Sequence, residues 1–593
     1  MSENHWPDTT RITHGGFTLD LAREAIRNIK YEGVQLIDLL YTAIRPLNWS
    51  TLKADEYSAN VQIIGSDCAI TITETFAGAL AAETKITLSD NNTFSVHYEL
   101  KGLSEYQVNR WGICFCLNTA DWMGSSVLSS GNTYSLAQNI SPQRVVDGVT
   151  QGLFPASNEM NFVGPDNRYL KVLSTGKVLE AEDQRNWTDS TYKIYSGSLS
   201  EPFPFLVSAG DIWTQRANFE VGVPKRIEAD PTKILVREIE ALPSIGLQLN
   251  ADPLLSPDDL EKALVLLEID HLRINEEALT SQKIATTAAN GLILEVALLS
   301  SSNGDALKAE VLQLSERVPA GSRLLVQREG RGVVDETELP RNDFLNAYIP
   351  GSDAFLVDLQ KDKKSFGYSV SYSMVPTVHS FDTETIFKTL HTQQESIEFA
   401  QKFIAPQVFI SPITFSTRGN PDSGHSRDKR LTYAEPEMAL HIRTIEGAAW
   451  TLGSIFALAS AGAFSGSWHE LFGEFGIIYS QSDSIKFSPT FHAISALGAH
   501  RAHQITIATS LDNSWVAFEN RETKTILVAS LRPWTVEITA KVLAGYKSMQ
   551  SLRGNDCEKA GQIMDWWSYA ETTPVLADFP LTLSPFEIAL IRG

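Results

Sequence analysis

Hydrophobic and polar residues alternate with a period of two over much of the first 230 residues. Alternation of this kind is typical of β-strands that bury one face. Asp90-Asn91-Asn92 provides a turn between two of the strand-like segments. Many short strands joined by polar turns favour a sandwich over a parallel sheet, so we predict an N-terminal β-sandwich at 1–235. The clearest strands are Phe17–Leu21, Ala69–Thr73, Lys85–Leu88 and Phe94–Tyr98.

Beyond about residue 235, strand-like runs alternate with helical segments. Ser256-Pro257-Asp258-Asp259 is a typical helix start, with an N-cap serine, an early proline and acids near the positive end of the helix dipole. The alternation predicts a (β/α)8 TIM-type barrel at 236–500. A doubly wound open sheet is the alternative, but no GxGxxG-type phosphate loop follows a strand.

The eight strands expected for this barrel are Ser244–Asn250, His271–Ile274, Leu292–Leu298, Arg323–Val326, Ala354–Leu359, Phe366–Tyr372, Gln407–Ile410 and Gly462–Ser467. The helices expected between them are Leu260–Leu267, Ser281–Ala289, Ala306–Arg317, Thr383–Leu390, Ser396–Phe403 and Glu437–Ala461.

Short alternating segments return after Gln504 and predict a C-terminal β-sandwich at 501–593. The chain is therefore expected to be a multidomain β and α/β protein, a sandwich–barrel–sandwich arrangement common in sugar-processing enzymes. The strands expected here are Ile505–Thr509, Trp515–Phe518, Thr525–Ser530, Thr535–Thr539 and Phe586–Ile591.

The bulk composition excludes several classes of protein. With 593 residues the chain is too long for one hydrophobic core, and about three domains are expected. A formal net charge of −22 argues against a nucleic-acid partner or an anionic membrane surface. The N-terminal residues lack the basic and apolar regions of a secretory signal, and no apolar run reaches the roughly 18 residues of a membrane span. We expect a cytoplasmic protein.

The cysteines indicate packing more than chemistry. Cys68, Cys114, Cys116 and Cys557 lack metal-ligand spacing. Cys114 and Cys116 lie two residues apart in a strand-like run, so they point the same way as core residues, with a disulfide or zinc site as the lesser alternative. The sequence calls for neither a cofactor nor a metal.

The segment Glu180–Tyr195 has neither helical spacing nor clean alternation, and it is unusually rich in polar groups. Carboxylates and amides bind hydroxyl groups, and an aromatic face covers the C–H side of a sugar, so the segment suggests a site for a polyhydroxylated ligand. The structural alternative is a solvated turn with local ion pairs. The candidate side chains are Glu182, Asp183, Arg185, Asn186, Trp187, Asp189 and Lys193.

A barrel enzyme collects its reactive groups at the carboxyl ends of its strands. Glu470, in Ser467-Trp468-His469-Glu470 after the eighth strand, is the strongest candidate there. His379 is equally well interpreted as a catalyst or as a core histidine whose ring nitrogens are hydrogen-bonded within the fold. For Asp382, a role as the N-cap of the next helix is favoured over a catalytic role. For His469 and Glu474 a packing or surface role is favoured. The other polar residues near strand ends are Asn250, Arg273, Asp358, Arg418 and Asn420.

The block EDQRNWTD at Glu182–Asp189, followed by an aromatic residue, Lys193 and an aromatic residue, resembles the D-apionate lactonase family. Weaker matches lie at Ile29–Val34, Tyr41–Arg45 and Asn48-Trp49. Family members keep a glutamate at the position of Glu470, preceded by two tyrosines where this chain has Trp468 and His469.

The resemblance implies hydrolysis of D-apionolactone to D-apionate in apiose catabolism, with a small sugar lactone as the partner. Water addition to the lactone carbonyl needs a base, donors for the oxyanion and an acid for the leaving oxygen. We assign the base to Glu470 or His379 and its partner to Glu182 or Asp183. The expected ligand contacts are Arg185, Asn186, Trp187, Asp189, Lys193, Asn250 and Arg273.

Two other functions remain open at the level of the sequence. A glycoside hydrolase would need two carboxyl groups about 5–5.5 Å apart for retention or about 6.5–9.5 Å apart for inversion. A carbohydrate-binding protein without catalysis would keep the polar groups and lack turnover. No GxSxG elbow and no HExxH motif occurs, so serine-hydrolase and zinc-protease chemistry have no support.

Overall fold

The computed structural model describes the chain except for residues 1–5, 7–8, 24, 48, 50, 147–148, 225–232, 250–253, 277–278, 280–290, 329–331, 342–346, 362–365, 380–381, 416–439, 499–503, 544 and 577–578. Its internal contacts divide it into two compact units. One is chiefly Trp6–Glu228, and the other is chiefly Ala229–Pro421 together with His425–Gly593.

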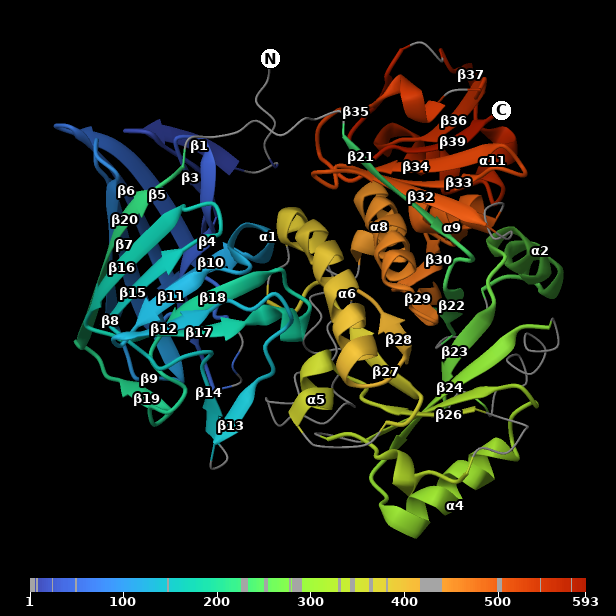
Figure 1. The fold of residues 1–593 in the computed structure, drawn as a ribbon, viewed down its shortest axis with the longest axis horizontal. Helices are drawn as coiled ribbons and strands as arrows, with labels where there is room; N and C mark the ends of the chain where they lie inside the picture. Colours follow the sequence, from blue (N-terminus) through green and yellow to red (C-terminus); the bar gives the residue numbers. More distant parts are fainter. Residues whose placement is uncertain are drawn as a thin grey trace. The chain divides into compact units, whose positions relative to one another are not determined.

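The first unit is a β-sandwich, as its alternating sequence predicts (Figure 1). A seven-stranded antiparallel sheet has the order β1-β2-β3-β4-β10-β18-β17, and a nine-stranded sheet has the order β12-β11-β15-β16-β20-β8-β7-β6-β5. The strands are β1 Thr9–His14, β2 Phe17–Ala22, β3 Ala25–Tyr31, β4 Val34–Arg45, β5 Glu56–Ile64, β6 Asp67–Phe76, β7 Leu80–Leu88, β8 Thr93–Gly102, β10 Arg110–Asn118, β11 Ser126–Ser129, β12 Asn132–Ser135, β15 Glu159–Val163, β16 Tyr169–Thr175, β17 Leu179–Asp183, β18 Thr191–Ser196 and β20 Ile212–Gly222.

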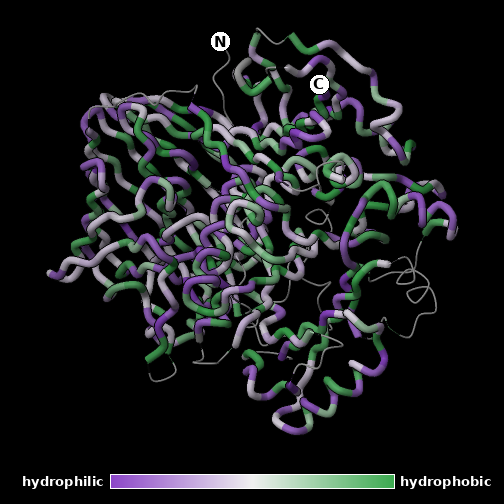
Figure 2. Tube along the Cα trace, turned by 45° about the vertical axis from the view of Figure 1, so that its right-hand side comes forward, coloured by the Kyte–Doolittle hydropathy of each residue, from purple (hydrophilic) through white to green (hydrophobic). Residues whose placement is uncertain are grey.

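The core of this sandwich follows from the period-two pattern. Alternate residues of both sheets, such as Leu40, Phe115 and Ile194 from one and Ile72 and Phe219 from the other, form one buried hydrophobic cluster. The same alternation of hydrophobic and hydrophilic residues can be followed along the strands in Figure 2. Residues between these positions point to the opposite face of each sheet, and this places half of the Glu180–Tyr195 segment away from the core.

The second unit contains a closed barrel of eight parallel strands. Neighbouring strands pair from β22 to β29 in chain order, and an additional pairing of β22 with β29 closes the sheet. The predicted barrel is therefore confirmed, and the open doubly wound sheet is excluded. The strands are β22 Ser244–Gln248, β23 His271–Asn275, β24 Ile293–Ser300, β25 Arg323–Arg328, β26 Ala347–Gly351, β27 Ser369–Met374, β28 Gln407–Ile413 and β29 Ser465–Phe472.

One predicted barrel strand is wrong. The fifth strand is β26, whereas the predicted strand Ala354–Leu359 contains the start of helix α5, Leu356–Lys361. Both segments are apolar and buried, and burial on every side removes the periodicity that separates a short helix from a strand. The helices predicted at Thr383–Leu390 and Ser396–Phe403 form one helix, α6, Thr383–Phe403. The helix predicted at Ser281–Ala289 lies outside the described residues.

Local capping sets the ends of the barrel helices. Ser256 caps α2, Pro257–Leu267, by accepting from the Asp259 amide, as predicted. The predicted capping role of Asp382 is confirmed, because its side chain accepts from the Thr385 amide at the start of α6. α8, Ile445–Ala461, packs beside α6 in Figure 1 and ends at Gly462 in the left-handed conformation. The other helices here are α4 Gly304–Ser315 and α9 Pro489–Gly498.

The C-terminal residues form a seven-stranded sheet in the order β21-β32-β33-β34-β39-β36-β37, with a two-stranded sheet β35-β38 and a hydrophobic cluster of its own. β21 joins this sheet although it precedes the first barrel strand and falls mostly in the segment predicted for the barrel. The strands are β21 Ile234–Ile239, β32 Ile505–Ser510, β33 Trp515–Asn520, β34 Thr525–Ser530, β35 Val536–Ile538, β36 Ser548–Leu552, β37 Thr573–Pro574, β38 Leu581–Leu583 and β39 Ile588–Arg592.

Candidate active site at the barrel mouth

The centre of the EDQRNWTD block is a buried ion pair. Arg185 Nη2 lies 2.7 Å from Asp183 Oδ2 and Arg185 Nε lies 2.9 Å from Asp183 Oδ1, with both side chains fully buried. The guanidinium also donates to the carbonyl oxygens of Gln138, Ala137 and Asn139, and Asp183 accepts from the Ser141 amide. These contacts tie the 137–141 loop to the end of β17.

Asp183 and Arg185 therefore use their hydrogen-bonding groups within the fold, and this favours a structural role over the predicted catalytic role of Asp183 and ligand-binding role of Arg185. Asn186 shares this role, since its amide nitrogen donates to the carbonyl oxygens of Ser141 and Asp183. Trp187 and Asp189 are only 9% and 4% exposed. The polar composition of the block thus reflects, for the most part, the fixing of a loop.

Alternate residues of the two strands flanking this turn carry a second set of charges. Lys193 Nζ lies 3.1 Å from Glu182 Oε1, and the Tyr195 hydroxyl donates to Glu180 Oε2 at 2.7 Å. Burial would lower the pKa of the Lys193 ammonium, but Glu182 and neighbouring groups raise it above its ordinary value. Lys193 therefore stays charged and remains a candidate ligand contact of this unit, and Glu182 remains the candidate partner of the base.

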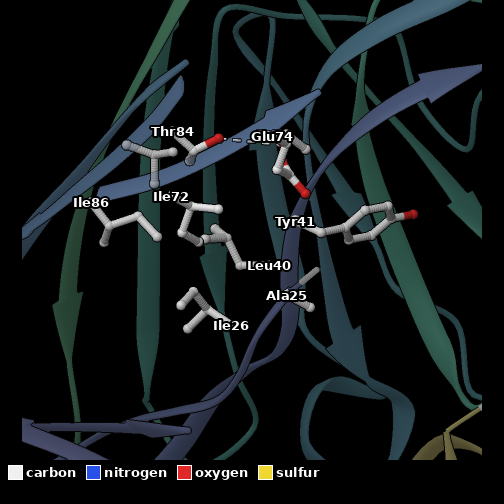
Figure 3. A pocket seen from close by; sticks show the side chains of 10 residues that line it. Ala25, Ile26, Leu40, Tyr41, Ile72, Glu74, Thr84 and Ile86 are labelled. Carbon is white, nitrogen blue, oxygen red and sulfur yellow. Dashed lines mark hydrogen bonds between the residues drawn. The ribbon is translucent and has the colours of Figure 1, made fainter. Parts of the chain in front are cut away.

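A small cavity lies close to these residues inside the sandwich (Figure 3). Ile26, Leu40 and Ile72 point into it, and the ring of Tyr41 extends away from them. Its volume is about 10 Å³, enough for one water molecule but not for a sugar. This cavity is therefore excluded as a substrate pocket.

The interior of the barrel is strongly polar along β22, β23, β24 and β29. Arg273, 1% exposed, donates through Nε to Ser411 Oγ at 3.1 Å and through Nη1 to Asn275 Oδ1 at 3.1 Å. The same nitrogen lies 3.4 Å from Gln248 Oε1, and Nη2 lies 3.7 Å from the carboxylate of Asp353. Gln248, Asn275 and Asp353 all lie at or just after the carboxyl ends of their strands, so Arg273 provides a fixed positive charge beneath the barrel mouth.

Glu470 is turned toward this mouth by a bulge in β29. It is the register partner of Gln248, although Trp468 partners the preceding Leu247, so one extra residue is inserted at His469. Trp468 and His469 both point outward, the indole donating to Ser454 Oγ and the imidazole meeting Thr451 Oγ1, both on α8. Because paired residues share a face, Glu470 lies on the inner side with Gln248.

His469 performs the packing that makes this bulge possible. Its φ is +24°, a conformation that side-chain-bearing residues rarely adopt. The ring stacks on Phe415 with centroids 5.3 Å apart, and burial lowers the pKa of His469 to about 3. The imidazole is therefore neutral near pH 7, and the predicted packing role of His469 is confirmed.

The remaining predicted residues fall into three groups. His379 lies in the loop after β27 and is partly exposed, which is compatible with both interpretations. Asp358 lies in α5 and accepts from Ser352 Oγ at 3.2 Å, and Glu474 is exposed. Asn250, Arg418 and Asn420 lie outside the described residues.

Several interior residues were missed at the level of the sequence: Gln248, His271, Glu295, Asp353, Ser411 and Ser467. A signal for part of this set was present. In His271-Leu272-Arg273-Ile274-Asn275 polar residues alternate with apolar ones, although a barrel strand buried on both faces is usually apolar throughout. Such an alternation indicates a polar barrel interior.

Within the described part of the chain, no cluster of three or more histidine, cysteine, aspartate or glutamate side chains could hold a metal ion. None of the helices described is long and apolar enough to cross a bilayer. Cys114 and Cys116 are buried free thiols on one face of β10, and burial raises the pKa of both.

A closed parallel barrel whose mouth gathers a carboxylate, amides and a guanidinium has the architecture of a barrel enzyme. Comparison with known proteins gives the family. A model described as D-apionate lactonase, N-terminal domain, matches residues 1–223, and one described as D-apionate lactonase, TIM barrel domain, matches residues 351–502. A D-apionate lactonase from Brucella anthropi is 21% identical over 612 residues, covering 92% of this chain and 97% of that protein. The chain belongs to the D-apionate lactonase family.

Solved structures of sugar-processing enzymes show a distant likeness. An arabinofuranosidase, 13% identical, covers 60% of this chain and 99% of its own, with a TM-score of 0.41. A GH30 endoxylanase from Clostridium papyrosolvens, 9% identical, covers 59% of this chain and 96% of its own, with a TM-score of 0.35.

Proposed function

We propose that this protein hydrolyses a sugar-acid lactone, with D-apionolactone as substrate and D-apionate as product, in the breakdown of the branched sugar apiose. The family and the full-length D-apionate lactonase relative support the reaction class. The structural observation that carries the proposal is the bulge in β29, which turns Glu470 toward the inner face beside Gln248. A carboxylate on the inner face of the same barrel that holds a buried guanidinium supplies what lactone opening needs.

In the proposed mechanism Glu470 removes a proton from a water molecule as that water attacks the lactone carbonyl carbon. The carbonyl oxygen becomes an oxyanion, and the positive charge of Arg273 stabilises the negative charge that develops. Collapse of the tetrahedral intermediate breaks the bond to the ring oxygen, which takes the proton held by Glu470. The products are a hydroxyl group and a carboxylic acid, which loses its proton to solvent to give the carboxylate, and no covalent enzyme intermediate forms.

Two further groups have candidate roles in this reaction. His379, in the partly exposed loop after β27, is the alternative base or a second acid. Lys193 is the proposed contact for the carboxylate of the ligand, and Glu182, which is paired with Lys193 on the sheet face opposite the sandwich core, stays the proposed partner of the base. The charge of Lys193 suits the acid product.

Assays on three kinds of ligand test the proposal. The purified protein is incubated with D-apionolactone, with other five-membered sugar lactones and with aryl glycosides, and acid release and aryl alcohol release are followed separately. Opening of a sugar lactone, fastest for D-apionolactone, is the expected result. Aryl glycoside cleavage would establish a glycoside hydrolase, and ligand binding by calorimetry without turnover would establish a binding protein.

A further inference from the structure

Glu295 is a fully buried carboxylate at the centre of the barrel interior, on β24. One of its oxygens, Oε1, accepts hydrogen bonds from two serine hydroxyls, Ser411 and Ser467, both at 2.6 Å. Its other oxygen, Oε2, lies 3.7 Å from His271 Nε2 and 3.9 Å from Arg323 Nη1. An isolated buried carboxylate would be costly, so this arrangement of partners requires an explanation.

The surroundings keep Glu295 ionised. Burial acts to raise its pKa, but His271, the two serine hydroxyls and Arg323 together hold the pKa below its ordinary value. An ionised carboxylate only accepts hydrogen bonds, so both serine hydroxyls must donate to it. The direction of the hydrogen bond at each serine is thereby fixed.

The orientation of the Ser411 hydroxyl determines how Ser411 interacts with Arg273. Because the Ser411 proton points to Glu295, the serine oxygen presents its lone pairs to Arg273 Nε, 3.1 Å away. A guanidinium has donors and no acceptor, so a serine hydroxyl turned the other way would lose one of these two bonds. Both hydrogen bonds, from Ser411 to Glu295 and from Arg273 to Ser411, therefore form in only one orientation of the Ser411 hydroxyl.

We propose that Glu295, acting through Ser411, is a positioning residue that fixes the guanidinium of Arg273 beneath the barrel mouth. Its kinetic consequence rests on the proposed lactone hydrolysis. A preorganised charge needs no rearrangement as the oxyanion forms, and holding Arg273 at Nε leaves the rest of the guanidinium directed at the strand ends that carry Asn275 and Asp353.

Ser467 provides a matched control within the same cluster. Its hydroxyl donates to the same Glu295 oxygen at the same distance as Ser411, but its other neighbour is His271 Nε2 at 2.8 Å. Replacing either serine by alanine removes one hydroxyl and one hydrogen bond to Glu295. Only the Ser411 change removes the contact with Arg273.

The test uses the full chain with S411A, S467A, S411T, R273K and the double variant S411A/R273K. In crystal structures, S411A is expected to release the Arg273 guanidinium from its place beside Asn275, and S467A is expected to leave it there. An unmoved Arg273 in S411A would overturn the proposal, and this readout needs no turnover.

Kinetics on the sugar lactone give the second readout. S411A should lower kcat/KM roughly tenfold, the size of losing one hydrogen bond to a charged group, with S411T restoring most of it and S467A changing it less than about twofold. In the R273K background S411A should have little further effect, because the two residues act together. Equal losses for the two serines, or additive losses with R273K, would overturn the proposal. A wild-type protein that opens no lactone would refute the proposed function, and the crystal structures would then decide on the positioning role.

Discussion

Glu470 and Gln248 are register partners at the carboxyl ends of β29 and β22, and a single inserted residue, His469, sets that pairing. Side chains alternate along a strand, so without the insertion Glu470 would point to the helices and His469 would point into the barrel. A neutral, buried imidazole thus occupies the outward position, and the carboxylate occupies the inward one.

The buried His469 makes stability depend on pH. In the unfolded chain His469 binds a proton when the pH falls below its ordinary pKa of about 6.5, but in the folded chain its pKa is about 3. The unfolded state therefore binds more protons between these values, and the free energy of unfolding falls as pH drops from 6.5 toward 3. The slope approaches about 1.4 kcal/mol per pH unit well below pH 6.5, so His469 alone should cost about 2 kcal/mol between pH 7 and pH 5.

Urea unfolding of the wild type and H469Q at pH 7 and pH 5 measures this effect. The glutamine removes the titrating group and can keep a hydrogen bond to Thr451, so H469Q should lose less stability on acidification than the wild type. Equal losses in the two proteins would show that His469 already binds a proton in the folded state.

The Asp183–Arg185 pair is expected to stabilise the N-terminal unit. Replacing Asp183 with asparagine leaves a buried guanidinium without its charge partner, and the expected loss is about 3–5 kcal/mol in the free energy of unfolding. The exposed pair of Lys171 with Glu159 is the control, and E159Q should cost less than about 1 kcal/mol. Similar losses in D183N and E159Q would argue that Asp183 is free for catalysis.

We expect Arg273 to contribute to turnover of the lactone through its positive charge. R273Q removes the positive charge beneath the mouth and should lower kcat on the lactone by roughly 10²–10³-fold, as loss of an oxyanion-stabilising group does. R273K keeps a charge and should lose less. Circular dichroism confirms that each variant is folded, and a kcat for R273Q near that of the wild type would exclude Arg273 from the reaction.

Lys193 tests whether the N-terminal unit contacts the ligand. K193M should raise KM for the lactone about tenfold with little change in kcat, because a ground-state contact is lost. K171M, which removes an exposed lysine from the same unit, should leave KM unchanged. An unchanged KM in K193M would assign the Glu182–Lys193 pair to the stability of the fold.

The sequence predicted the fold well where its pattern reflects one buried face. The sandwich strands emerged from period-two alternation, and α2 and the start of α6 followed from the caps Ser256 and Asp382, although α6 was predicted as two helices. The fifth barrel strand failed because Ala347–Gly351 and the α5 segment are both short, apolar runs buried on all sides. Periodicity carries no information in such a segment.

The site was harder to predict because polar residues serve folding as well as binding. Glu182–Asp189 has the composition of a sugar site, yet Asp183 and Arg185 bind each other and a neighbouring loop. Glu295 was hidden in an apolar strand, and its partners Ser411 and Ser467 lie more than 100 residues away in sequence. The spacing of these residues in the sequence does not reveal the cluster, because only the closed barrel brings them together.

The central claim is that Glu470, turned inward by the bulge, is the general base for lactone opening. The most direct measurement is the kcat of E470Q on D-apionolactone, with E474Q, a change at the exposed glutamate four residues on, as the control. Loss of the base should lower kcat by roughly 10²–10⁴-fold in folded E470Q, and E474Q should keep wild-type turnover. Near-normal turnover in E470Q, or an equal loss in both variants, would contradict this account.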